Sequence, residues 1–70
     1  MRANRAYELR VSRGAPTAMI EVLEIGSGEI ALFWDVRQDQ ARRFAGALRT
    51  DLAQLEAGDF LEKWARWEQS

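Results

Sequence analysis

The sequence predicts a small α+β domain in which a three-stranded antiparallel meander is followed by two helices, in the order β-β-β-α-α. Three segments with strand-type patterns come first, and a helix-type repeat of apolar residues follows them. Hydrophobic residues make up 47% of the chain and charged residues 30%, a balance typical of a globular protein. Residues 1–70 are expected to form a single domain, because a chain this short cannot build two cores.

The three strands are predicted from side-chain alternation and from turn residues. Residues 7–12 alternate apolar and polar side chains, and a glycine and a proline soon follow. Residues 17–25 and 29–36 are rich in β-type residues and enclose the glycine-containing loop 26–28. Two such runs around a three-residue loop indicate a β-hairpin.

The hairpin register follows from the apolar face that it creates. A three-residue loop pairs Ile25 with Glu29, whereas a four-residue loop would set Glu24 against Glu29, a like-charge pair. A shift by one residue would exchange the two faces, so the three-residue loop is favoured. The first strand joins the same sheet if Arg10 faces Glu21 in a cross-strand ion pair. One face then carries an apolar set, namely Ala18, Ile20, Val22, Ile30, Leu32, Trp34 and Val36.

Two helices are predicted after the sheet. The first begins near Arg37, with a capping box that starts at Asp35, and ends at Gly58. The second begins at once with a capping box at Asp59 and continues to about Glu68. The first helix is expected to pack on the apolar sheet face through a stripe of residues at helical spacing, namely Ala41, Phe44, Ala45, Leu48, Leu52 and Leu55.

Composition excludes several classes of function. The chain has no histidine and no cysteine, which excludes Ser-His-Asp and Cys-His catalysis, disulfide frameworks and zinc fingers. Four hairpin carboxylates could in principle bind a metal, but cross-strand pairing and helix capping account for them: Glu21, Glu24, Glu29 and Asp35. We therefore expect no enzymatic activity, no catalytic residue, no metal site and no cofactor.

Charge is arranged in alternating blocks. Residues 1–14 hold four Arg and one Glu, and residues 37–50 hold four Arg and one Asp. Residues 15–36 hold four acids and no base, and residues 51–70 hold five acids and two bases. A dimeric nucleic-acid-binding regulator is the alternative function, and its basic patch would use Arg2, Arg5, Arg42, Arg43 and Arg49. Equally strong acidic blocks oppose phosphate binding, so nucleic acid ranks below a protein partner.

The second face of the sheet carries the functional prediction. It is expected to be apolar, with Ala31 among its residues and with Glu21 and Glu29 as interruptions, where a solvent-facing sheet would be polar. Either the second helix covers this face with Phe60 and its tryptophans, or another chain does, and the two are compatible. The predicted interface residues are Met19, Leu23, Ile25, Phe33, Trp64 and Trp67.

The sequence thus predicts a non-enzymatic protein–protein interaction module. Its expected partners are a second copy, in a homodimer, and an unidentified protein of which it would be an accessory subunit or a phage- or plasmid-type inhibitor. Dimerisation would supply the buried surface that a 70-residue chain lacks. The longest uncharged stretch, Gly14–Ile20, is too short to span a membrane, so no membrane partner is expected and a cytoplasmic location is the default.

Overall fold

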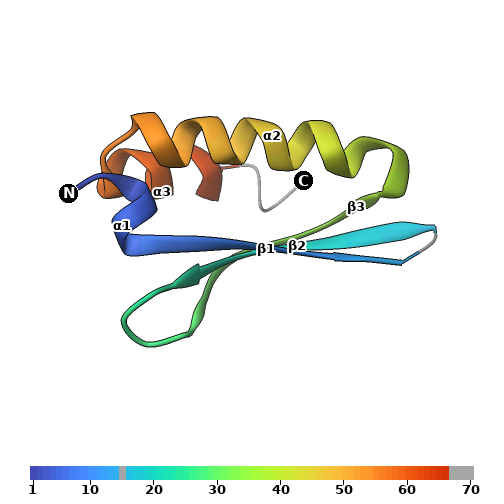
Figure 1. Ribbon diagram of the computed structural model, residues 1–70, viewed down its shortest axis with the longest axis horizontal. Coiled ribbons are helices and arrows are strands. Elements are labelled where there is room, and N and C mark those ends of the chain that lie inside the picture. Colours follow the sequence, from blue (N-terminus) through green and yellow to red (C-terminus); the bar gives the residue numbers. More distant parts are fainter. Residues whose placement is uncertain (15, 67–70) are drawn as a thin grey trace.

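The computed structural model describes residues 1–14 and 16–66 and confirms the predicted α+β fold (Figure 1). The strands and the two later helices occur in the predicted order, and a one-turn helix that was not predicted precedes them. The elements are α1 (Ala3–Ala6), β1 (Tyr7–Arg13), β2 (Thr17–Glu24), β3 (Ile30–Arg37), α2 (Gln38–Gln54) and α3 (Ala57–Ala65).

The sheet is an antiparallel meander with strand order β1-β2-β3, and its register is the predicted one over most of its length. Arg10 is the partner of Glu21 in the β1–β2 pair. Ile20 faces Trp34 in the β2–β3 pair. The apolar pattern predicts this register because a shift by one residue would turn buried side chains toward solvent.

The β2–β3 hairpin differs from the prediction, because its loop has four residues instead of three. The N–H group of Glu24 donates to the carbonyl of Glu29 at 2.8 Å, so the loop is residues 25–28. The two glutamates are exposed, and the Ser27 hydroxyl donates to the Glu24 carboxylate at 2.8 Å. Gly28 adopts φ +77°, a conformation that suits glycine and favours it in such loops.

A register shift absorbs the additional loop residue. The pairing changes between Val22 and Leu23, so that Leu23 faces Ile30. An irregularity of this kind bends a hairpin locally, and Figure 1 shows the hairpin curling away from the helices. Ile30, which was expected on the helix-covered face, is 52% exposed as a result.

Both predicted capping boxes are wrong. Strand β3 continues through Arg37, so Asp35 is still paired with Met19 in the sheet and cannot cap α2. The N-cap residues are Arg37 for α2 and Glu56 for α3, and neither makes a side-chain capping hydrogen bond. Since α3 begins at Ala57, Asp59 already lies in its first turn.

The α2–α3 junction is held by the N-terminal segment. The Ala3 N–H donates to the Leu55 carbonyl at 2.9 Å, and the Ala57 N–H donates to the Met1 carbonyl at 2.8 Å. The Met1 ammonium donates to Glu56 Oε1 at 2.8 Å, and this hydrogen bond and the ammonium charge lower the pKa of Glu56. These contacts hold Leu55 and Glu56 extended, so α2 ends at this point and not at the predicted glycine.

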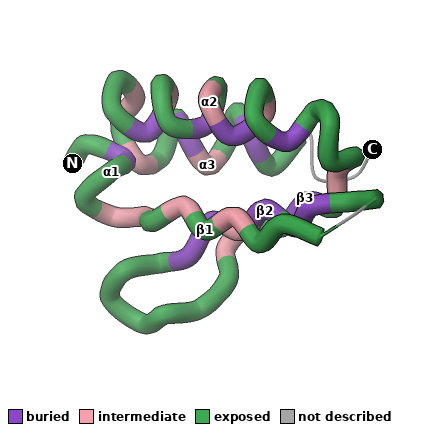
Figure 2. The backbone as a smooth tube through the Cα atoms, turned by 45° about the vertical axis from the view of Figure 1, so that its right-hand side comes forward, coloured by how far each residue is buried: buried purple, intermediate pink, exposed green. Residues whose placement is uncertain are grey.

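All three helices lie on the same side of the sheet, which makes the protein two-layered (Figure 1). The buried residues of the sheet and of α2 face one another across the space between the layers (Figure 2). The core combines side chains from every element except β1, whose apolar residues pack against it half-buried. Its largest fully buried side chains are Phe60, Ile20, Leu48 and Val22.

An aromatic cluster joins the sheet to both long helices. The Trp34 ring of β3 lies 5.2 Å from the Phe44 ring of α2 and 5.9 Å from the Trp64 ring of α3. Phe44 and Trp64 contact each other edge to face at 5.5 Å, and Phe60 lies 6.5 Å from Trp64. Each such pair contributes about 0.5–1.5 kcal/mol beyond the burial of its area.

Asp51 links α2 to α3 through two hydrogen bonds. Its Oδ2 atom accepts from Lys63 Nζ at 2.6 Å and from Trp64 Nε1 at 2.9 Å. The Asp51 side chain is 15% exposed, whereas that of Lys63 is 52% exposed. The indole contact is the better shielded of the two, because Trp64 itself is buried.

We expect Gly46→Ala to stabilise the protein by about 1 kcal/mol, because glycine in a helix interior is unfavourable by that amount. A Cβ atom at Gly46 would meet no other atom within 4 Å, so nothing in the fold opposes it. Urea denaturation followed by tryptophan fluorescence measures the change. As a control, Gly28→Ala should destabilise by about 1–2 kcal/mol because of its positive φ. A destabilised Gly46→Ala variant would contradict this description of α2.

We expect Asp51→Ala to destabilise the protein by about 1–3 kcal/mol, because it leaves the buried Trp64 N–H without its acceptor. Lys63→Met, the matched variant, removes a half-exposed ammonium and should lower stability by less than about 1 kcal/mol. The same urea titration compares the two. Equal losses would mean that the ion pair, and not the indole hydrogen bond, joins the helices.

Candidate functional site

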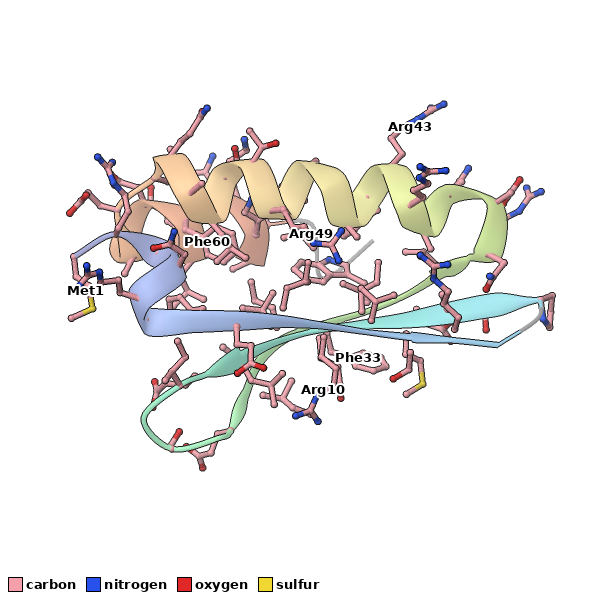
Figure 3. All side chains as sticks on the ribbon, in the orientation of Figure 1. Met1, Arg10, Phe33, Arg43, Arg49 and Phe60 are labelled. Carbon is pink, nitrogen blue, oxygen red and sulfur yellow. The ribbon has the colours of Figure 1, made fainter. Side chains whose placement is uncertain are left out.

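The sheet face that points away from the helices is the candidate functional site, and we call it the open face. Alternation along the paired strands assigns its side chains. Figure 3 shows Arg10 and Phe33 projecting from this side, opposite the helices. The open face comprises Glu8, Arg10, Ser12, Met19, Glu21, Leu23, Phe33 and Asp35.

Exposed apolar surface is concentrated on the open face and on the adjoining hairpin. Among the described residues, five large hydrophobic side chains are exposed, and four of them belong to β2, to β3 or to the loop between them. These four are Met19 (43%), Ile25 (50%), Ile30 (52%) and Phe33 (38%). Apolar patches of this kind, bordered by charged residues, are typical of interaction surfaces.

The structure brings only part of the predicted interface onto one exposed surface. Met19 and Phe33 lie exposed on the open face, and Ile25 lies exposed in the hairpin loop. Leu23 is only 8% exposed, and it lies at the register shift of the β2–β3 pair. Trp64 is 7% exposed and belongs to the core on the helix side of the sheet, and Trp67 lies outside the described residues.

Helix α3 does not cover the open face. From the sequence alone, the apolar side chains of α3 could pack on either face of the sheet. In the structure Phe60 and Trp64 enter the same core as Ile20 and Leu48, on the opposite side of the sheet. The alternative in which these two residues shield the second face within one chain is therefore wrong.

The sequence did not predict that Ile30 belongs to the exposed apolar surface of the hairpin. The three-residue loop placed it on the helix-covered face, whereas the observed register shift pairs it with Leu23. The backbone of the curled hairpin is anchored by the Ile25 N–H, which donates to the Ala6 carbonyl at 3.0 Å. A four-residue loop would have placed Ile30 correctly. The sequence disfavours that loop because it pairs two like charges, Glu24 and Glu29.

A cation and an anion lie side by side in the middle of the open face. Arg10 and Glu21 are direct cross-strand neighbours, and Phe33 follows in the same row. No ion pair within 4.0 Å joins Arg10 to Glu21 among the described residues, so the expected cross-strand ion pair is not formed. Their charges are thus available to groups outside the chain.

The arginines of the predicted basic patch do not gather on one surface. Arg2 Nη1 donates to the Gln54 carbonyl at 2.7 Å, at the C-terminal end of α2. Arg42 lies twelve residues earlier on the same helix, about 18 Å away along its axis. Figure 3 shows Arg43 pointing away from the sheet and Arg49 on the sheet side of α2.

Residues 1–14 and 16–66 contain neither a candidate metal site nor a membrane-spanning helix. No three acidic side chains gather there in a way that could hold a metal ion. Glu24 and Glu29 lie at the hairpin loop, whereas Asp35 lies near the other end of β3. The helices in this part of the chain are also too short or too polar to cross a membrane.

No known protein family matches the chain, and no curated protein sequence or solved structure is significantly similar to it. The open face therefore remains the basis for a function: the exposed Met19 and Phe33 lie there among four charged side chains that make no ion pair within the described residues, namely Glu8, Arg10, Glu21 and Asp35.

Proposed function

We propose that this chain is a non-enzymatic protein–protein interaction module that pairs with a second copy through the open face. The supporting observation is that Met19 and Phe33 are exposed on the side of the sheet that carries no helix, with Ile25 and Ile30 exposed in the adjoining hairpin. In this proposal the homodimer acts in the cytoplasm as an accessory subunit or an inhibitor of a larger protein.

A second copy suits the open face because it supplies a missing layer. A three-stranded sheet with helices on one side has only one of its two faces covered. A 70-residue chain has few other residues with which to build a core. Two such sheets can stack face to face about 10 Å apart, with their strands nearly aligned. The Met19 and Phe33 side chains of both copies would then become part of a shared apolar layer.

The positions of Arg10 and Phe33 suit the same arrangement. A two-fold axis along β2 would lay β1 of one copy over β3 of the other, so that Arg10 stands over the Phe33 ring of the second copy. An arginine over an aromatic ring contributes about 0.5–2 kcal/mol. On this axis the two Glu21 side chains face each other at the centre, and each Arg10 lies one strand away, where it offsets part of their charge.

The dimer would leave the outer surface of α2 available to the larger partner. Arg42 and Arg43 are exposed there and make no ion pair among the described residues. Arginine is enriched at protein interfaces because its planar group binds carboxylates in pairs of hydrogen bonds. The partner surface should therefore be acidic where it meets α2.

We expect Phe33→Glu to keep the fold but to dissociate the homodimer, because it would bury an unpaired carboxylate beside Glu21. Light scattering at tens of micromolar should give close to twice 8.0 kDa for the unmodified chain and 8.0 kDa for the variant. Circular dichroism should show unchanged secondary structure.

Leu32→Glu is the matched control, one residue away on the covered face. Leu32 is 2% exposed, so a carboxylate there should unfold the chain. A Phe33→Glu variant that stays dimeric, or an unmodified chain that is monomeric, would refute the proposed dimer. DNA binding at physiological salt that weakens in Arg42→Ala and Arg43→Ala would favour the nucleic-acid alternative instead.

A further inference from the structure

A groove lies between α2 and α3, on the helical side of the protein and away from the open face. Its volume is about 580 Å³, within the range of about 300–1,000 Å³ typical of small-molecule sites. Six residues of α2 and two of α3 line it: Gln40, Arg43, Phe44, Ala47, Thr50, Asp51, Lys63 and Trp64.

The floor of the groove is aromatic and held in place from below. The Phe44 and Trp64 rings contact each other edge to face at 5.5 Å. Trp34 packs against both from the sheet, at 5.2 Å from Phe44 and 5.9 Å from Trp64. The Trp64 indole is also fixed by its hydrogen bond to Asp51. The groove therefore offers a preformed apolar surface, to which Ala47 also contributes.

The polar rim of the groove carries a net positive charge. Asp51, the one acid that lines it, already accepts from Lys63 and from Trp64 through the same oxygen. Lys63 retains N–H groups beyond the one that Asp51 binds. Arg43 makes no ion pair within the described part of the chain, and its guanidinium keeps all its donors. An occupant should therefore bring a negative charge.

We propose that the α2–α3 groove binds a small apolar carboxylate, such as an aromatic acid. The apolar part lies against Phe44, Ala47 and Trp64, where it displaces water from an aromatic floor. The carboxylate accepts a pair of hydrogen bonds from Arg43, the geometry for which a guanidinium is best suited, and it lies within the positive field of Lys63. This site is independent of the proposed dimer, since it uses the other side of the sheet.

The test is a titration of the full chain with 4-phenylbutyrate and, separately, with its uncharged amide. The Trp64 indole N–H resonance in ¹H–¹⁵N spectra reports binding, because this group borders the groove. We expect a saturable shift with 4-phenylbutyrate and an affinity about tenfold weaker for the amide, as the loss of a charge-assisted pair implies.

Three variants locate the interaction. Arg43→Gln should reduce the preference for the carboxylate to less than about threefold, whereas Arg42→Gln, a neighbouring exposed arginine outside the groove, should leave it unchanged. Ala47→Trp fills the groove from an exposed helix position and should abolish the shift while the fold persists. Phe33→Glu should bind as the unmodified chain does, which separates this site from the open face.

Three results would overturn the proposal. Equal affinity for acid and amide would show that the cations take no part. An equal loss of the preference for the carboxylate in Arg42→Gln and Arg43→Gln would indicate a general attraction of anions to a basic helix. The absence of a saturable shift at millimolar 4-phenylbutyrate would show that the groove is not a binding site.

Discussion

The placement of every helix on one side of a three-stranded sheet is the constraint from which the other features follow. Trp34, Phe44 and Trp64 form one aromatic cluster, so the sheet, α2 and α3 share a single core. Asp51 adds hydrogen bonds that hold α3 against α2. With α3 fixed in this position, no helix of the described chain covers the opposite face. The open face is thus a direct consequence of how the core is built.

The same core produces two surfaces of different character on opposite sides of the molecule. On the open face the exposed Met19 and Phe33 side chains lie among Glu8, Arg10, Glu21 and Asp35, and we propose that this surface packs on a second sheet. The α2–α3 groove is concave, aromatic at its floor and cationic at its rim, which suits a small anion-bearing ligand. A dimer formed through the open face would carry both grooves on its outer sides. Ligand binding and self-association could then occur together.

Strand faces and register could be predicted from periodic patterns in the sequence. The features that depend on tertiary contacts could not. Alternation placed Met19 and Phe33 on the open face and set Arg10 opposite Glu21, because a register shift would have turned apolar residues outward. The cap at Asp35 failed because strand pairing continues past it. The position of Trp64 could not be predicted, since an apolar helix side can pack on either face of a sheet. The hairpin loop depended on a local register shift that leaves no periodic signal.

The central claim, that the open face joins two copies, is tested most directly by exchanging charges at its centre. Arg10→Glu and Glu21→Arg each place four like charges at positions 10 and 21 of the two copies, so each variant alone should give 8.0 kDa by light scattering. An equimolar mixture restores balanced charge, and it should give twice that mass, as should the double variant. A mixture that stays monomeric while the unmodified chain dimerises, or single variants that remain dimeric, would show that the copies meet through another surface.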